Sequence, residues 1–444
     1  MSRVKACFDR NPSYYASGWS PRHPEAATQE AQLPHIELKL KDGYSPNSPS
    51  NIVPETQAYN SDKHLIFLIR KHPQSVGGVQ RHSARLSEGF SQIYKVDKIN
   101  WYGPEWGAPI YFPVFYQRAI RNGAHLVHCD DAVTALIGAK IRENSSKKVI
   151  ATVHGLDVIL PIQWYQNRLK KALGNLDKIV CVSRATAAEV INRGIPPEKI
   201  AIIPNAAEKI QRTYQRNDST YARLKELTGY DFKDKIILYS LGRPLKRKGF
   251  DSFAASVMPY LPDDFIYVVA GPKPKIPSWI NTFKPIFPPQ TFHKLLLASG
   301  CYSCHNEMVQ LSKNPRIIYI NEINDEIRNL LFAVSDLFIM PNRTIEGDME
   351  GFGIVALEAS ARGVPVVATG IEGITDAVID GRNGYCVAEG DFRGMAEVIA
   401  GLINNPQKLA VLKQNANKLA QNEFSMEAII KKYEDVFQDL LSTK

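Results

Sequence analysis

The chain has 444 residues, which is long enough for two domains of ordinary size and a tail. Hydrophobic residues make up 44% of it and charged residues 22%, as is typical of a soluble globular protein, and no run of 18 apolar residues occurs that would predict a transmembrane helix. The net charge of +9 is compatible with a phosphate-bearing ligand, an anionic membrane surface or a nucleic acid as partner. The charge alone does not distinguish among these three.

Residues 1–60 are predicted to form an extension that is largely irregular or disordered, because they are rich in Pro, Ser, Asn and Gln and show no sustained apolar period. From His64 onward, short buried-strand signals alternate with helix signals. This rhythm is typical of βαβ units in a parallel sheet with helices on both faces. The expected strands of this first Rossmann-like domain, residues 61–206, lie in HLIFLI, AHLVHCD, KVIATVHG, KIVCVS and AIIPN.

The alternation restarts after Asn205 and predicts a second Rossmann-like domain over residues 207–420. The connection over residues 272–313 is longer than usual and is interpreted as an insertion. Residues 421–444 are amphipathic and predict a C-terminal helix. The expected fold class is therefore α/β, with two doubly wound domains facing a central cleft in which ligands bind beyond the carboxyl ends of the strands. The strands of the second domain are expected in KIILYSLG, FIYVVAG, RIIYI, LFIMPN, VPVVAT and GYCV.

Glu358 places a carboxylate in the middle of an apolar helix. The segment EGDMEGFGIVALEASARGVPVV, residues 346–367, predicts a glycine-rich loop followed by a short helix that stops at Gly363. At 3.6 residues per turn, Glu358 shares its face with Ile354, Val355 and Ala361, so that face should be buried. A buried carboxylate is costly unless it is hydrogen-bonded, and we expect its partner to come from elsewhere in the chain or from a ligand.

Other candidate residues follow expected strands directly. Arg243 and Lys248 in LGRPLKRKG suit a diphosphate, although the default interpretation of this stretch alone is a solvated basic loop. Glu350 in EGFG stands at the start of a helix, where it can accept hydrogen bonds from hydroxyls or simply complement the helix dipole. His154 ends the strand in ATVHG, where it either faces the cleft or is a satisfied structural residue.

Six cysteines are scattered apart from one pair, which suits free thiols in a reducing cytosol, so we expect a cytoplasmic protein. The first residues contain no apolar core, and no secretory signal is expected. The pair lies in CYSCH, Cys301 to His305, which matches the c-type haem attachment pattern and half of a zinc site. Haem attachment needs export and no fourth zinc ligand is evident, so a chance match in an inserted loop is favoured.

The ordered set of motifs resembles glycosyltransferase family 4, a family of retaining enzymes with the GT-B architecture. LGRPLKRKG, VVAG, EGFGIVALEASARGVPVVAT and AVIDGRNGYCV occur in the order and spacing of that family, and Glu350 and Glu358 match its E-x7-E motif. GGVQRH, TVHG, CVSRAT and IIPNAAE match its first domain. The resemblance covers about residues 64–440, and the extension and the insertion are not part of the family core.

The resemblance also implies a role for each matching residue. Arg243 and Lys248 would hold the donor diphosphate and stabilise the leaving group in place of a metal. Glu358 would accept hydrogen bonds from the ribose hydroxyls, and Glu350 would contact hydroxyls of the donor sugar. The C-terminal helix would cross back to the first domain. The remaining implied contacts are Gly351, Phe352 and Gly353 for the sugar and phosphate, Gly78 for the diphosphate and acceptor, His154 for the sugar near the reacting carbon, and Asn321 for the base.

The implied activity is transfer of a hexosyl group, with retention, from a UDP- or GDP-linked sugar to a hydroxyl of a polysaccharide, lipopolysaccharide or lipid-linked glycan. No metal and no cofactor are expected. In a front-face displacement a departing phosphate oxygen takes the acceptor proton, and a covalent role for Glu350 is the less favoured alternative. Aromatic and basic residues occur together in residues 108–123 and 161–174, which suits contact with an anionic membrane face or ordinary helices with a solvated basic side.

Three rival functions remain. The first is a GT-B enzyme that performs another reaction on a nucleotide sugar or a sugar phosphate. The second is a non-catalytic protein that binds nucleotide sugars, and the third is a haem or metal protein built on CYSCH. Nucleic acid is not an expected partner, because the basic residues are spread along the chain without a stacking platform.

Overall fold

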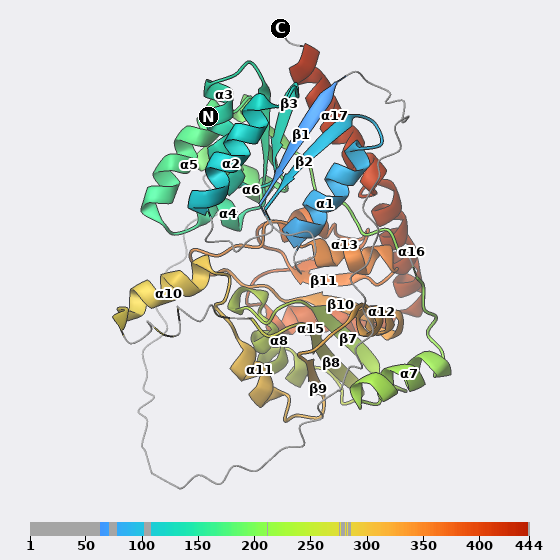
Figure 1. Ribbon diagram of the computed structural model, residues 1–444. Helices are drawn as coiled ribbons and strands as arrows, with labels where there is room; N and C mark the ends of the chain where they lie inside the picture. The colour runs from blue at the N-terminus through green and yellow to red at the C-terminus, as the bar shows by residue number, and fades with distance from the viewer. Residues whose placement is uncertain are drawn as a thin grey trace, which may run out of the picture. The chain divides into compact units, whose positions relative to one another are not determined.

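The computed structural model describes residues 63–442 except for 71–77, 102–107, 211, 275, 277–279, 281 and 283–285. The predicted extension, residues 1–60, lies outside the described residues. The described residues contain two parallel sheets of six strands each, with helices between successive strands (Figure 1). This arrangement confirms the expected α/β class with two doubly wound sheets.

The first sheet has the strand order β2-β1-β3-β4-β5-β6, and all its neighbouring strands are parallel. Its inner strands are apolar runs because both faces are covered, whereas the edge strand β2 is polar and partly exposed. The strands are β1 (His64–Ile69), β2 (Lys95–Asn100), β3 (Leu126–Cys129), β4 (Lys148–Val153), β5 (Lys178–Cys181) and β6 (Ile200–Ile202). The helices are α1 (Gly78–Phe90), α2 (Ala108–Arg121), α3 (Ala132–Glu143), α4 (Leu156–Ile159), α5 (Gln163–Asn175) and α6 (Arg184–Asn192).

The second sheet has the order β12-β11-β10-β7-β8-β9 and is also parallel throughout. Two short helices, α10 (Pro289–Ala298) and α11 (His305–Leu311), belong to the predicted insertion. The strands are β7 (Ile236–Leu241), β8 (Phe265–Ala270), β9 (Ile317–Ile320), β10 (Leu337–Met340), β11 (Val366–Thr369) and β12 (Gly384–Val387). The other helices are α7 (Asp218–Thr228), α8 (Phe250–Ser256), α12 (Asp325–Val334), α13 (Ile354–Ala361), α14 (Ile374–Ala377), α15 (Phe392–Ile403), α16 (Pro406–Asn422) and α17 (Met426–Ser442).

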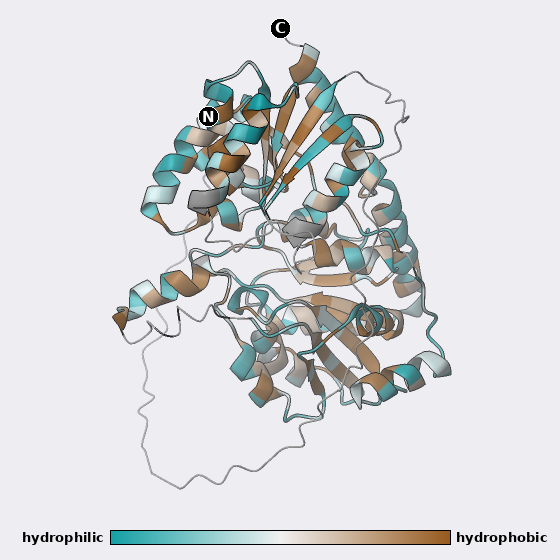
Figure 2. Ribbon diagram, in the orientation of Figure 1, coloured by the Kyte–Doolittle hydropathy of each residue, from teal (hydrophilic) through white to brown (hydrophobic). Residues whose placement is uncertain are grey.

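Each sheet has a hydrophobic core on both of its faces. Figure 2 shows the central strands in brown, and β8, with the sequence FIYVVA, is buried at all six positions. Some helices begin at side-chain caps: Asp131 accepts a hydrogen bond from the amide of Thr134 at α3, and Asn324 accepts one from the amide of Ile327 at α12. Within the described residues, no helix is long and apolar enough to cross a membrane.

The C-terminal helix packs on the first sheet. Ile429, Ile430, Tyr433 and Phe437 of α17 share one buried cluster with residues of β1 and α1, and Figure 1 shows α17 beside these two elements. The Phe437 ring stacks on Phe90 with 4.8 Å between the ring centroids. The preceding helix, α16, instead joins the core of the second sheet. The expected return of the C-terminal helix to the first domain is therefore confirmed.

Candidate active site

The second sheet reverses its strand order between β7 and β10, which lie side by side although almost 100 residues separate them in the chain. Ligands of doubly wound sheets bind at such a switch point, beyond the carboxyl ends of the strands. The loop after β7 carries Arg243 to Lys248. The segment after β10 runs from Asn342 to the start of α13 and carries Glu350. Strand order therefore brings together the two motifs that the sequence singled out.

Three donors from these two segments converge on one carboxylate oxygen. Lys248 Nζ and Arg247 Nη1 each lie 2.5 Å from Glu350 Oε2, and Asn342 Nδ2 donates to the same oxygen at 3.2 Å. Lys248 is only 9% exposed. Arg247 also pairs through Nε with Asp348 Oδ1 at 3.1 Å. The default interpretation of this stretch as a solvated basic loop is therefore wrong for Arg247 and Lys248, because strand pairing carries both cations into the protein.

The buried charges shift the proton affinity of their neighbours. Burial alone would raise the pKa of Glu350, but Arg247 and Lys248 outweigh it and lower this pKa to about 2. Burial lowers the pKa of Lys248, and Glu350 opposes that effect. Glu350 is therefore a carboxylate at physiological pH, held between two cations.

Glu372 is part of this cluster and was missed from the sequence. Its Oε2 accepts a hydrogen bond from the main-chain amide of Glu350 at 2.5 Å. Burial, together with the nearby charges of Glu350 and Asp348, raises the pKa of Glu372 to about 7. The residue occupies a left-handed conformation, with φ of 48°, in the turn before α14. In the sequence it is one acid in a glycine-flanked turn, and no motif distinguishes it.

Arg243 has a different environment from Arg247 and Lys248. Its side chain is exposed, and Nη1 donates to the main-chain oxygen of Gly300 at 3.3 Å. Gly300 belongs to the predicted insertion. The structure therefore separates the two predicted cations: Lys248 meets Glu350 directly, whereas Arg243 is held by the insertion.

Glu358 is buried in α13 with 3% of its surface exposed, as the apolar pattern around it predicts. Its charge contributes to raising the pKa of Tyr239, after the burial of that phenol. Arg362, four residues later at the C-terminal cap of α13, donates from Nη1 to the main-chain oxygen of Glu358 at 3.0 Å and pairs through Nη2 with Glu208.

The glycines before α13 permit close approach of main chain. An ideal Cβ on Gly351 would lie 1.7 Å from the main-chain oxygen of His154, so only glycine fits between these segments. Gly353 precedes α13 with φ of 87° and, as a glycine, has no side chain to cap the helix. The first amides of α13 therefore have no side-chain cap from it and are suited to bind an anion. The Phe352 side chain is buried in the core, so a ligand would meet its main chain.

His154 follows β4 and lies next to the loop that carries Glu350. Its Nε2 bonds to the main-chain oxygen of Asp130 at 3.0 Å, and since a carbonyl only accepts, this nitrogen carries the proton. The rings of His154 and His82 meet edge to face at 5.6 Å. Burial and the charge of Asp131 raise the pKa of Asp130 to about 8, although Arg70 and Thr134 oppose this effect. His154 therefore combines a satisfied ring nitrogen with a position beside the glycine loop.

For two further predicted residues, the structure gives the position in the fold and does not test the predicted ligand contacts. Gly78 is the first residue of α1, and residues 71–77 before it lie outside the described part of the chain. Asn321 is exposed directly after β9, at the same end of the sheet as the other candidates. Their contacts with phosphate, acceptor and base remain predictions.

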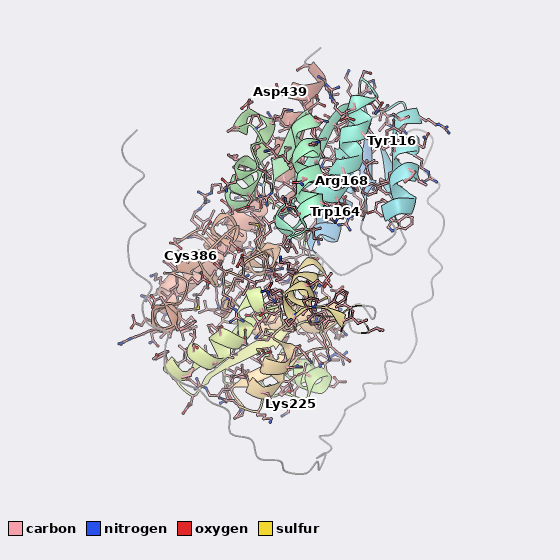
Figure 3. The ribbon with its side chains drawn as sticks, turned by 90° about the vertical axis from the view of Figure 1, so that its left-hand side faces the viewer. Tyr116, Trp164, Arg168, Lys225, Cys386 and Asp439 are labelled. Carbon is pink, nitrogen blue, oxygen red and sulfur yellow. The ribbon has the colours of Figure 1, made fainter. Side chains whose placement is uncertain are left out.

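Only part of the aromatic and basic stretches that were predicted to suit a membrane face is exposed. Tyr111, Phe115 and Tyr165 are buried in the first core. Trp164 on α5 is 59% exposed, and the Arg168 guanidinium lies over its ring at 5.3 Å (Figure 3).

The CYSCH motif leads into α11, whose first residue is His305. Both thiols are buried: Cys301 donates to the main-chain oxygen of Ser299 at 3.3 Å, and Cys304 donates to that of Leu245 at 3.6 Å. His305 Nδ1 bonds to the Tyr319 hydroxyl at 2.9 Å. Among the described residues, no three His, Cys, Asp or Glu side chains are grouped so as to hold a metal ion.

Comparison with known proteins agrees with this architecture. The solved structure of Anabaena Alr3699/HepE in complex with UDP matches with a TM-score of 0.62 at 18% identity, over 85% of this chain and 100% of that chain. The mannosyltransferase of Mycolicibacterium smegmatis described as a GDP-mannose-dependent alpha-(1-6)-phosphatidylinositol monomannoside mannosyltransferase is 26% identical over 388 residues, 78% of this chain and 91% of that protein. CapM of Staphylococcus aureus, a capsular polysaccharide biosynthesis glycosyltransferase, is 31% identical over 275 residues, 59% of this chain and 62% of CapM.

The fold and the motif-bearing loops define a protein of the GT-B class. Two family models match the chain: Glycosyltransferase Family 4 over residues 87–208 and Glycosyl transferases group 1 over residues 229–419. Together they cover more than half of the sequence. The chain belongs to glycosyltransferase family 4.

Proposed function

We propose that the protein is a retaining, metal-independent hexosyltransferase that uses a UDP- or GDP-linked sugar as its donor. The observation that carries the proposal is the convergence of Arg247 and Lys248 on Glu350 at the switch point of the second sheet. The phosphate oxygens of a bound diphosphate are negatively charged, as the Glu350 carboxylate is, so Arg247 and Lys248 can pair with them as well. The names of relatives support such a donor, because one specifies GDP-mannose and the HepE structure contains UDP.

Lys248 and Arg243 would act on the leaving group. Negative charge grows on the departing diphosphate as the bond from the sugar carbon to phosphate oxygen breaks, and Lys248, Arg243 and the first amides of α13 stabilise it. The acceptor hydroxyl oxygen bonds to the same face of that carbon, and its proton passes to the departing phosphate oxygen. No added base or metal enters this scheme.

Glu350 and Asn342 would hold the donor sugar. Asn342 Oδ1 is buried and accepts no hydrogen bond from the described residues, so a sugar hydroxyl can donate to it. Glu350 Oε2 already accepts from three donors, and its pKa of about 2 makes it a weak nucleophile. Both facts support a role in binding sugar hydroxyls over a covalent role. Glu358, which is buried in α13, would accept hydrogen bonds from the ribose.

The acceptor would be a polysaccharide, lipopolysaccharide or lipid-linked glycan, reached from the cytoplasm. Peripheral contact with an anionic membrane face is supported by Trp164 and Arg168, an exposed aromatic ring paired with a cation on α5. Sedimentation with vesicles of phosphatidylglycerol and phosphatidylcholine tests this contact. Trp164→Ala should release the protein from the vesicles, whereas Tyr260→Ala, at an equally exposed aromatic residue, should not.

The donor site is tested by thermal stabilisation with UDP-, GDP- and ADP-sugars in the presence of a chelator. One nucleotide series should raise the melting temperature, and Lys248→Ala and Arg243→Ala should lower turnover with that donor by about tenfold or more, since each removes a charge-assisted contact. Lys225→Ala, at an exposed lysine paired with Asp231, is the matched control. Wild-type turnover in both cation variants would refute the assignment of the phosphate site.

A further inference from the structure

The predicted insertion, residues 272–313, is hydrogen-bonded to the cationic loop after β7. Its segment Gly300–Cys304, which includes most of the CYSCH motif, runs antiparallel to that loop, with Leu245 and Ser303 forming an isolated β-bridge. The amide of Lys246 donates to the oxygen of Tyr302 at 2.9 Å. The amide of Cys304 and the hydroxyl of Ser303 both donate to the oxygen of Pro244, each at 2.8 Å.

Side chains strengthen this connection at both ends. Arg243 Nη1 donates to the oxygen of Gly300, whose left-handed conformation, with φ of 60°, directs the main chain there. At the other end, Lys246 Nζ pairs with Glu307 of α11 at 2.6 Å. The insertion therefore contacts the main chain of the loop and also the side chains of its two cations, Arg243 and Lys246.

The insertion also reaches the second loop of the site. Leu297, at the end of α10, is 3% exposed, and its Cδ1 would lie 3.5 Å from a Cβ built on Gly347. Pro161, from the first sheet's half of the chain, lies 3.6 Å from the same position. Gly347 is three residues before Glu350. The insertion thus borders both segments that carry the candidate donor site.

We propose that residues 300–304 are a positioning element, which orients Arg243 toward the second phosphate of the donor. This inference rests on the proposed function. An exposed arginine on a loop has many rotamers, and binding must overcome the entropy of selecting one of them. Fixing the main chain at Pro244 and Lys246, and the guanidinium on Gly300, would reduce that cost before the ligand arrives. Ser303, Cys304 and Gly300 then serve the phosphate site through Arg243, without contact with the substrate.

Removal of the Ser303 hydroxyl tests this role. Calorimetry measures the affinity of the full chain for UDP and UMP, and for GDP and GMP. Ser303→Ala should weaken binding of the diphosphate by about fivefold, the equivalent of one ordinary hydrogen bond, and leave binding of the monophosphate unchanged. Ser299→Ala is the matched control, because its hydroxyl donates to Leu296 within the insertion and not to the cationic loop. It should leave both affinities unchanged.

A double-mutant cycle shows whether the effect passes through Arg243. In an Arg243→Ala background, Ser303→Ala should cause no further loss of diphosphate affinity. Gly300→Ala gives a second route if Ser303→Ala fails to fold, because its methyl would meet no atom closer than 3.7 Å while straining the left-handed conformation; it should cause the same selective loss.

Equal losses for diphosphate and monophosphate, or an undiminished effect of Ser303→Ala without Arg243, would overturn the positioning role and leave the proposed function standing. A wild-type chain that binds no nucleoside diphosphate would overturn both.

Discussion

Replacing Gly351 with alanine should uncouple transfer from donor binding. Gly351 does not have a left-handed φ, so alanine can adopt its backbone conformation and the whole cost is steric. The new Cβ would lie 1.7 Å from the main-chain oxygen of His154, where a carbon and an oxygen normally stay about 3.3 Å apart. The loop must therefore move by about 1.5 Å from the segment that carries His154, because no flexible side chain is available to yield.

The expected effects differ between binding and turnover. A misplacement of about 1 Å between reacting groups can cost roughly a hundredfold in rate, so kcat/KM should fall by about that factor. Overpacking of this kind costs about 1–3 kcal/mol of unfolding free energy. Affinity for the free nucleotide should change little, because Lys248 and Glu358 lie on the same half of the chain as Gly351.

Gly401→Ala is the matched control. A Cβ on Gly401 in α15 would meet nothing within 4 Å, so this change should stabilise the helix by about 0.5–1 kcal/mol and leave kcat/KM unaltered. Wild-type kcat/KM in Gly351→Ala would refute the conclusion that the contact with His154 matters for transfer.

Three further predictions concern other parts of the molecule. Glu358→Ala should abolish the preference for UDP or GDP over the 2′-deoxy nucleotide in calorimetry, because the ribose acceptor is lost; a retained preference would exclude that role. Because burial raises the pKa of Glu372 to about 7, its contribution to stability is complete below pH 4 and is lost as the pH rises through 7. Glu372→Gln should therefore raise the melting temperature at pH 8 and hardly at pH 4, and equal shifts at both would contradict this pKa. Tyr433→Phe removes the 2.9 Å hydrogen bond to Thr152 and should cost about 1 kcal/mol in urea unfolding, while Tyr260→Phe, on an exposed ring, should cost nothing.

The sequence alone predicted the strands of both sheets except β2, whose polar sequence KVDKIN gives no buried-strand signal, and it predicted the burial of Glu358. β8 is predicted because FIYVVA is apolar throughout, as a strand covered on both faces must be. The burial of Glu358 follows from its helical neighbours, because helix period determines which residues share a face. Both are local properties, and both agree with the structure. The resemblance of ordered motifs added the family.

Only the tertiary structure decided which charges meet. Arg247 and Lys248 lie about 100 residues from Glu350, and their contact depends on β7 pairing with β10, which no local period encodes. Glu372 joins the same cluster through a turn without a motif. The pairing of Ser303 with Pro244 joins an insertion to a loop 59 residues earlier. Local sequence determines the secondary structure and the buried face of a residue, whereas strand order and loop packing determine which distant residues it contacts.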